Sequence, residues 1–338
     1  MRRRPAPPRG DTVGAVVDAR PGGRGESRLG ILRWLAWGPW LAQVVVTRKC
    51  NLTCGYCTEY DRTSEPVPFD VLAARLAKLR ALRAWAVCLT GGEPTLHPRL
   101  VDLVAEMRRL GIPRREMITN GTLLTRDLVR GLNEAGLTNL QISVDGVTPN
   151  EVTVKTLKPL RKNLELLAAE ARFRVVMSGV VGSTAPGEVL EVVRFAREHG
   201  FTPRVLLLHD EAGQVRPSPE ELTAYHEAQQ WVGRGGREAG DYGRRLAETG
   251  RAPFRCRAGA RYLYVDEFGR VNWCAQTRGI FAKDLLSYGF EDLREQFETP
   301  KACNEGCSLG CVRSTSKLDA WRRQGGERVA PVTNGDPA

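Results

Sequence analysis

Short apolar runs alternate with amphipathic stretches along the chain from residue 43 to residue 208. The amphipathic stretches keep apolar residues on one helical face, as Leu72, Leu76 and Leu79 do. The apolar runs cover residues 44–46, 86–89, 116–118, 140–144, 174–177 and 205–208. The helical stretches between them cover residues 69–82, 98–110, 124–135, 158–171 and 186–199. Six such repeats predict an α/β fold of parallel strands joined by right-handed crossovers.

The pattern changes after residue 209, which indicates further units behind the β-α repeats. A helical stretch over residues 219–231 leads into a connector rich in Gly and Arg over residues 233–250. Residues 262–265 and 270–273 flank a turn and predict a hairpin. We therefore expect a core domain over residues 29–215, a helical connector over 216–255 and a small cysteine-rich extension over 256–323.

Both chain ends are predicted to be disordered. Residues 1–28 form a basic tail of Arg, Gly and Pro, and residues 324–338 form a second tail. The apolar stretch 29–46 resembles a membrane span, but Arg33, Gly38 and Pro39 interrupt it. We assign its tryptophans to core packing, with a loose contact to lipid as the alternative. We expect a cytoplasmic protein without membrane association, since export would oxidise the thiols described below.

The net charge of +11 changes this picture little, because 42 of the 50 cationic residues are Arg, spread along the chain. No nucleic-acid-binding motif accompanies the charge, so nucleic acid is not expected as a partner. A basic protein does favour an anionic small molecule or a peptide as substrate.

Three cysteines, Cys50, Cys54 and Cys57, carry the chemistry that the sequence indicates most strongly. Three thiolates in one loop can hold three irons of a cubane cluster and leave the fourth iron open. A structural zinc site is the alternative, but zinc takes four ligands and the nearest histidine is His97. A disulfide framework does not fit a long chain with nine cysteines.

This CxxxCxxC spacing resembles the radical S-adenosylmethionine superfamily. The resemblance implies a partial (β/α)6 TIM-like barrel, in which reactive groups lie at the carboxyl ends of strands. It also implies a [4Fe-4S] cluster that reductively cleaves S-adenosylmethionine to a 5′-deoxyadenosyl radical. That radical would abstract hydrogen from a peptide or small-molecule substrate, leading to oxidation, cross-linking or epimerisation. A flavodoxin- or ferredoxin-type protein would donate the electron.

The run Gly91-Gly92-Glu93-Pro94 follows the second predicted strand and matches the GGEP motif of the same superfamily. The resemblance implies that Gly91, Gly92 and Glu93 hold the methionine amino group of the cofactor. Glycines allow close approach of the backbone, and a carboxylate accepts hydrogen bonds from an ammonium group. The alternative is a plain glycine turn with a solvated glutamate.

Polar residues end the third and fourth predicted strands. The resemblance assigns Ser143 to the polar shell around the ribose and carboxylate of the cofactor, with Asn120 and Asp145 as neighbours. It places Tyr56 next to the adenine. Turn-forming residues at strand ends and a packing aromatic are the alternatives.

Five further cysteines, Cys256, Cys274, Cys303, Cys307 and Cys311, lie in the extension. Its opening resembles the SPASM and twitch extensions of the superfamily, but it departs from the seven-cysteine SPASM pattern. Four thiolates close one cubane, so we expect one auxiliary [4Fe-4S] cluster with a spare cysteine or an open site. Cys303 is our choice for the spare, and a zinc site is the alternative.

The remaining candidates are assigned structural roles. Cys88 lies among apolar neighbours in the second strand and is expected to be a buried side chain. His97 and His209 are expected to be hydrogen-bonded structural residues, with His209 the better placed for substrate contact. A non-catalytic iron–sulfur electron carrier or redox sensor is the competing function, and it would have no use for the GGEP motif.

Overall fold

The computed structural model describes residues 28–209, 215–232 and 234–320. The two tails predicted at residues 1–28 and 324–338 lie outside the described residues, except for Arg28, which begins helix α1. Among the described residues, no helix is both apolar enough and long enough to cross a membrane.

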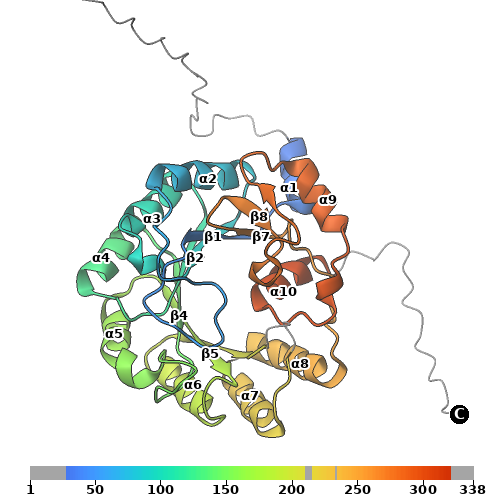
Figure 1. Cartoon of the computed structure of the whole chain (residues 1–338). Helices are drawn as coiled ribbons and strands as arrows, with labels where there is room; N and C mark the ends of the chain where they lie inside the picture. The colour runs from blue at the N-terminus through green and yellow to red at the C-terminus, as the bar shows by residue number, and fades with distance from the viewer. Residues whose placement is uncertain (1–27, 210–214, 233, 321–338) are drawn as a thin grey trace, which may run out of the picture.

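Six parallel strands form the centre of the molecule, each preceding a helix that lies on the outside (Figure 1). The alternating pattern is thus confirmed, and the fold is α/β with a partial TIM-like barrel. The strands are β1 (Leu41–Thr47), β2 (Ala86–Gly91), β3 (Arg114–Thr119), β4 (Asn139–Ser143), β5 (Arg174–Val181) and β6 (Thr202–Leu207). The helices are α2 (Phe69–Ala81), α3 (Leu100–Arg109), α4 (Arg126–Ala135), α5 (Leu157–Glu170), α6 (Glu188–Glu198) and α7 (Pro219–Trp231).

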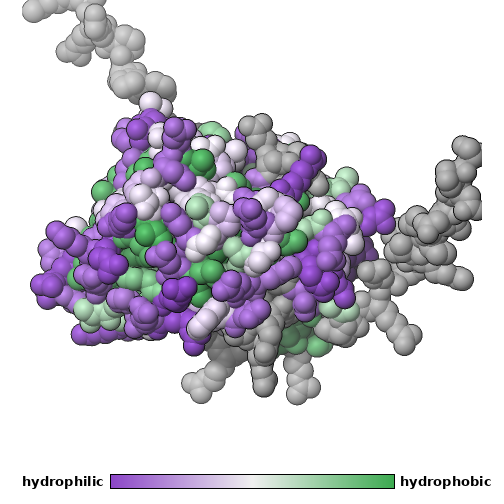
Figure 2. Space-filling view, turned by 90° about the horizontal axis from the view of Figure 1, so that it is seen from below, coloured by the Kyte–Doolittle hydropathy of each residue, from purple (hydrophilic) through white to green (hydrophobic). Residues whose placement is uncertain are grey.

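The main core lies between the strands and the surrounding helices. Helix α2 contributes Leu72, Leu76 and Leu79, each of which is almost inaccessible to water, as its sequence periodicity predicts. Val44 of β1 belongs to the same core cluster as these three leucines. Burial of one such side chain stabilises the fold by about 1.5–3 kcal/mol. On the face in Figure 2, hydrophilic side chains cover most of the surface and apolar ones form smaller groups between them.

The sheet continues past β1 into the carboxyl-terminal extension. Strand β7 (Tyr262–Val265) pairs in parallel with β1, and β8 (Arg270–Asn272) and β9 (Lys283–Asp284) follow antiparallel. The predicted hairpin is confirmed, but sequence reasoning did not anticipate that it extends the barrel sheet. The extension also contains α9 (Phe290–Glu298), α10 (Gly310–Ser316) and the short 3₁₀-helices η2 (Ala275–Thr277), η3 (Ala302–Asn304) and η4 (Lys317–Asp319).

The Gly- and Arg-rich segment expected as a connector contains a helix, α8 (Arg234–Thr249). Tertiary packing overrides the low helix propensity of glycine here. Leu246 is buried, and the Tyr242 ring packs 6.1 Å from that of Phe254. A Cβ at Gly243 would lie 2.6 Å from the Tyr225 hydroxyl oxygen of α7, so a glycine at this position permits the close contact.

Helix α1 (Arg28–Trp37) is held at its carboxyl end by one buried arginine of the extension. Arg261 donates to the carbonyl oxygens of Gly38 (2.9 Å) and Leu35 (2.8 Å), and it forms an ion pair with Asp319. The ring centroids of Trp34 and Trp40 lie 5.0 Å apart. Trp34 and Trp40 therefore pack within the fold, as expected for the tryptophans of this stretch.

Candidate functional site

The loop after β1 carries Cys50, Cys54 and Cys57 to the carboxyl end of the barrel. Cys54 is buried, and the other two are partly exposed. Burial raises the pKa of the Cys50 thiol, and the negative charges of Glu93, Cys57 and Cys54 raise it further. Within the described ranges, no three His, Cys, Asp or Glu side chains converge on a point suited to one metal ion. A cubane places each thiolate on a different iron and does not require such convergence.

Hydrogen bonds tie this loop to the end of β3. Asn120 donates from Nδ2 to Asn51 Oδ1 at 2.8 Å and lies 3.9 Å from Cys50 Sγ. Asn51 in turn donates to Thr122 Oγ1 at 2.7 Å. On the other side, the Gly55 N–H donates to the Val152 carbonyl oxygen at 2.9 Å. Asn120 therefore helps to position Cys50, because it binds the neighbouring Asn51 and contacts the Cys50 sulfur.

Gly91 and Gly92 bring the end of β2 directly against the chain that leads to Cys50. A Cβ at Gly91, whose φ is +139°, would lie 2.0 Å from the Thr47 carbonyl oxygen. A Cβ at Gly92 would lie 2.3 Å from the Arg48 carbonyl oxygen. Both contacts are with backbone, which cannot move aside as a flexible side chain can. The two glycines are thus needed for the packing of two loops, whatever ligand they also meet.

Glu93 is fully buried, so the alternative of a solvated turn residue is wrong. Its Oε1 accepts hydrogen bonds from the Thr95 N–H (3.0 Å) and from the hydroxyls of Thr95 (2.6 Å) and Thr119 (2.7 Å). Its Oε2 accepts from the Asn120 N–H at 2.7 Å. The carboxylate therefore joins the ends of β2 and β3 and caps the 3₁₀-helix η1 (Pro94–Leu96).

Asp145 is also fully buried and lies at the centre of a second polar group beside the cysteine loop. Its Oδ2 accepts from the hydroxyls of Tyr56 (2.6 Å) and Thr153 (2.8 Å), and it lies 3.3 Å from Lys155 Nζ. The Lys155 ammonium also donates to the Tyr56 hydroxyl. Asp145 Oδ1 has no hydrogen-bond partner among the residues that the structure describes. A buried acceptor of this kind is suited to a ligand hydroxyl or ammonium donor.

Sequence reasoning did not identify Lys155 or Thr153. Burial raises the pKa of the Cys54 thiol, whereas the Lys155 charge and a hydrogen bond from Thr153 lower it. Both residues lie in the loop between β4 and α5, and their only signal in the sequence is their position after a strand end. The remaining candidate, Ser143, ends β4 opposite Ser178 of β5 and is partly buried.

Four cysteines of the extension, Cys307 and the three whose charges act on it, form one group. The thiol pKa of Cys307 is raised first by burial and then by the negative charges of Cys256, Cys274 and Cys311. Burial similarly raises the pKa of Cys274 to about 11. Cys303 is the exposed member, and its charge acts on Cys256. That Cys303 is the spare cysteine stays a prediction.

A network centred on Glu59 connects the two cysteine regions. The Tyr264 hydroxyl of β7 donates to Glu59 Oε2, which also pairs with Arg48 (3.4 Å) and Arg278 (3.5 Å). Arg278 directly follows η2, the 3₁₀-helix that begins after Cys274. Its Nη2 donates to both carboxylate oxygens of Glu267, at 2.7 and 2.8 Å. The three-cysteine loop is thereby anchored to the extension through charge-assisted hydrogen bonds.

The structural assignments of three other residues agree with the coordinates. His97 is buried, its Nε2 lies 2.8 Å from the Val67 carbonyl oxygen, and its Nδ1 accepts from the Arg99 N–H. His209 Nε2 lies 3.2 Å from Gln276 Nε2. Cys88 is 2% exposed, and burial raises its thiol pKa well above the ordinary value.

Comparisons with known proteins place the barrel in a family. Residues 44–210 match the model of the radical SAM superfamily. A GTP 3′,8-cyclase of Chlorobaculum tepidum is 31% identical over 174 residues, covering 49% of this chain and 52% of the relative. A PqqA peptide cyclase of Bradyrhizobium diazoefficiens is 36% identical over 105 residues, covering 30% of this chain and 27% of the relative. The chain thus spans about half, or less, of the length of these relatives.

Two solved structures share the fold over most of the chain. Streptococcus suis SuiB bound to the precursor peptide SuiA has a TM-score of 0.62 and 15% identity, covering 81% of this chain and 69% of SuiB. The structure of anSMEcpe with bound AdoMet and a peptide has a TM-score of 0.56 and 18% identity, covering 82% of each chain. With residues 44–210 matched in sequence and the barrel matched in fold, this chain belongs to the radical SAM superfamily.

Proposed function

We propose that this protein is a radical enzyme that holds a [4Fe-4S] cluster on Cys50, Cys54 and Cys57 and uses it to cleave S-adenosylmethionine. One observation carries the proposal: the three thiols lie in one loop at the carboxyl end of the barrel, beside the buried Asp145, whose Oδ1 has no hydrogen-bond partner in the described part of the chain. Thiolates are the ligands that iron–sulfur clusters take in proteins. The three thiols therefore suit the cluster, and the buried Asp145 suits S-adenosylmethionine.

When bound, the cluster and S-adenosylmethionine supply reductive C–S cleavage and a 5′-deoxyadenosyl radical that abstracts hydrogen from an unactivated carbon. The protein holds these partners in place. Glu93 and Asn120 orient the cysteine loop through the hydrogen bonds described above. Asp145, with Tyr56 and Lys155 around it, offers a fixed acceptor to a polar group of the cofactor. Ser143 ends β4, two residues before Asp145.

We assign an auxiliary [4Fe-4S] cluster to Cys256, Cys274, Cys307 and Cys311, with Cys303 as the spare. The charges of Cys256, Cys274 and Cys311 all act on Cys307, which supports this set. Such a cluster would exchange an electron with the substrate-derived radical, which favours oxidation or cross-linking, whereas a free thiol as hydrogen donor favours epimerisation. A single zinc ion on the same thiols is the competing assignment.

The substrate class follows from the relatives and remains part of the proposal. The names of the matched relatives refer to GTP and to the PqqA peptide, and SuiB is bound to a precursor peptide. We propose a peptide or a polar small molecule for this chain, with a flavodoxin- or ferredoxin-type protein as electron donor. Nucleic acid is not part of the proposal.

The deciding experiment is cofactor cleavage by anaerobically reconstituted protein with dithionite. We expect methionine and 5′-deoxyadenosine from the unmodified chain and none from the variant Cys50→Ala/Cys54→Ala/Cys57→Ala, because no thiolate then holds the open cluster. Chromatography with mass detection measures both products. Cys303→Ala, which alters an exposed cysteine outside this loop, is the matched control and should retain cleavage. Products from the triple variant would refute the proposal. Their absence from the unmodified chain would favour an electron carrier or redox sensor.

A further inference from the structure

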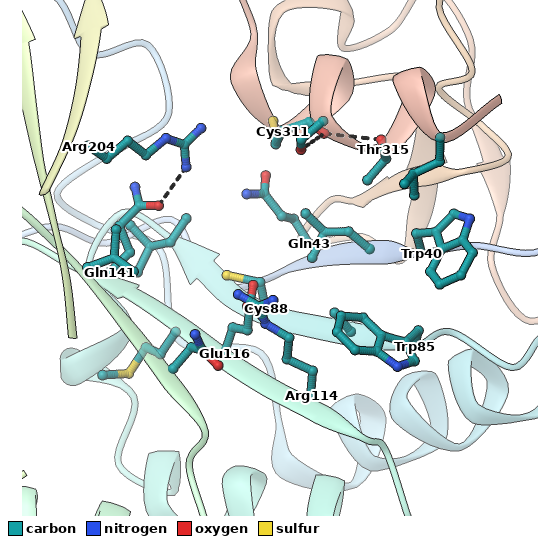
Figure 3. A pocket seen from close by; sticks show the side chains of 18 residues that line it. Trp40, Gln43, Trp85, Cys88, Arg114, Glu116, Gln141, Arg204, Cys311 and Thr315 are labelled. Atoms are coloured by element: carbon teal, nitrogen blue, oxygen red, sulfur yellow. Dashed lines mark hydrogen bonds and ion pairs between the residues drawn. The ribbon is translucent and has the colours of Figure 1, made fainter. Parts of the chain in front are cut away.

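A pocket of about 290 Å³ lies between helix α8 and the segment formed by α10 and η4. Figure 3 shows that Cys311 and Thr315 of α10 face the interior of the barrel. Arg313 and Lys317 each follow one of these residues by two positions, a step that turns a helix by about 200°. They therefore lie on the opposite face of this segment, where they line the pocket beside α8. The pocket is thus separate from the barrel interior and from the proposed radical site.

Positive charge dominates the lining of this pocket. Arg313 and Lys317 come from one wall, and Arg245 of α8 comes from the other. Among the lining residues that the structure describes, Asp241 alone is acidic, and it pairs with Arg244 at 3.7 Å. Within the described ranges, neither Arg245 nor Arg313 forms an ion pair with a carboxylate. Cations that converge on a hollow without acidic partners favour an anionic ligand.

Tyr242 of α8 fixes the orientation of the Arg313 guanidinium. The guanidinium carbon lies 4.5 Å from the centroid of the Tyr242 ring, in a cation–π contact. The N–H groups of a guanidinium lie in its plane, so stacking on a ring leaves them available to a ligand. Tyr242 is itself held, because its hydroxyl donates to the Cys307 carbonyl oxygen. Arg313 is therefore positioned before any ligand binds.

Two aromatic rings complete the pocket. The Tyr242 and Phe254 rings lie 6.1 Å apart at an angle of 48°. The loop that carries Phe254 is anchored to the extension, since Asn304 Nδ2 donates to the Phe254 carbonyl oxygen at 2.7 Å. The Ala252 N–H donates to the Glu305 carbonyl oxygen beside it. Such a wall suits a flat apolar group, and the volume is close to the lower end of the range for ligand pockets.

We propose that this pocket binds a small molecule in which a phosphate group is attached to an aromatic ring. A phosphate monoester carries close to two negative charges and three acceptor oxygens, which suit the cations Arg245, Arg313 and Lys317. Arginine binds phosphate through paired hydrogen bonds, and the ring packs against Tyr242 and Phe254. The proposal does not rest on the radical chemistry. The competing role for Arg313 is support of the cysteine group, through Tyr242 and the Cys307 carbonyl oxygen.

The test uses the full-length, iron-reconstituted protein in phosphate-free buffer, without S-adenosylmethionine or reductant. Calorimetric titration measures the dissociation constants of phenyl phosphate, phenyl sulfate and inorganic phosphate. We expect phenyl phosphate to bind about tenfold or more tightly than phenyl sulfate, which has the same ring and a single negative charge. It should bind about threefold or more tightly than inorganic phosphate, because only the ester has a ring. Phenyl phosphate that binds no more tightly than either of the other probes overturns the proposal.

A second comparison separates this pocket from the proposed cluster. The variant Cys50→Ala/Cys54→Ala/Cys57→Ala has no thiolates for the open cluster and should bind phenyl phosphate with unchanged affinity. Loss of binding in this variant would place the phosphate on the cluster iron and overturn the proposal. Because no step of the test involves cofactor cleavage, its result is independent of the outcome for the proposed reaction.

Variants of the lining locate the binding site. Arg313→Gln should weaken phenyl phosphate binding by about tenfold or more, and Arg245→Gln by about threefold or more. Arg194→Gln, a change at an exposed arginine of α6, should leave the affinity unchanged. Arg245 is exposed, so its variant decides the matter if Arg313→Gln fails to fold. Unchanged affinity in Arg245→Gln and Arg313→Gln overturns the proposal, and a lower iron content in Arg313→Gln would then assign Arg313 to the cysteine group.

Discussion

At the scale of single residues, the buried carboxylates of Glu93 and Asp145 organise the carboxyl end of the barrel. Each is fully enclosed, and each accepts hydrogen bonds from more than one loop. Glu93 has protein donors on both oxygens, whereas one oxygen of Asp145 has no partner among the residues that the structure describes. Glu93 therefore acts chiefly by holding the loops together, and Asp145 is better placed to meet a ligand directly.

Replacement of Glu93 by Gln should destabilise the protein and weaken cofactor binding. An amide has one acceptor oxygen, so at least one backbone donor at Thr95 or Asn120 loses its partner. We expect a loss of about 1–3 kcal/mol in the free energy of unfolding, measured in urea on the metal-free protein. Binding of S-adenosylmethionine, measured by calorimetry on reconstituted protein, should weaken as well. Glu65→Gln, at an exposed position, should change neither quantity, and the same null result at Glu93 would contradict this role.

The Lys155–Asp145 pair should show strong energetic coupling. Lys155→Met leaves the buried Asp145 carboxylate without its cation, at a cost of about 3 kcal/mol or more. Adding Asp145→Asn removes the unpaired charge, so the double variant should be more stable than Lys155→Met alone. Urea denaturation of the two single variants and the double variant gives the coupling energy. Additive effects would mean that the two charges do not interact.

At the scale of elements, Arg261 joins three segments that are distant in the sequence. It directly precedes β7, it donates hydrogen bonds to the Asp319 carboxylate in η4, and it donates to carbonyl oxygens at the carboxyl end of α1. The last carbonyl oxygens of a helix lack partners within the helix. Arg261 donates hydrogen bonds to several of these carbonyl oxygens and also forms a buried ion pair. This one side chain therefore stabilises this corner of the fold.

Arg261→Met should therefore lower the free energy of unfolding by about 3–5 kcal/mol, because the buried Asp319 carboxylate loses its ion pair with Arg261. Chemical denaturation followed by circular dichroism measures the change. Arg33→Met alters an exposed arginine on α1 and should shift stability by less than about 0.5 kcal/mol. Similar stabilities of the two variants would show that the Arg261 contacts contribute little.

At the scale of the whole molecule, the extension and the barrel share one continuous sheet, because β7 pairs with β1. The Glu59 network adds a second connection between the two cysteine regions. The two proposed ligand sets nevertheless come from separate segments of the chain. Iron in the extension should therefore be held independently of the three-cysteine loop.

The variant Cys50→Ala/Cys54→Ala/Cys57→Ala should keep about four irons and four sulfides per chain after reconstitution, the content of one closed cubane. In that background, Cys274→Ala should lower the iron content, because Cys274 belongs to the group of four thiols around Cys307. Cys303→Ala should leave it unchanged. Iron and acid-labile sulfide analysis measures both. A content of one zinc and no sulfide per chain would show that the extension holds a structural zinc site and no auxiliary cluster.

Local pattern determined a large part of this protein from sequence alone. Alternating apolar runs and helical periodicity predicted all six barrel strands, because their side chains repeat every two and every 3.6 residues. The three-cysteine spacing was readable for the same reason, since its ligands lie in one short loop. Tertiary structure alone decided which distant segments meet. Contacts between distant segments determine the pairing of β7 with β1 and the formation of helix α8. They also determine the ion pair between Lys155 and Asp145 and the hydrogen bond between Arg204 and Gln141. Residues far apart in the chain leave no periodic signal of their contact, and packing between them, not local propensity, determines their positions.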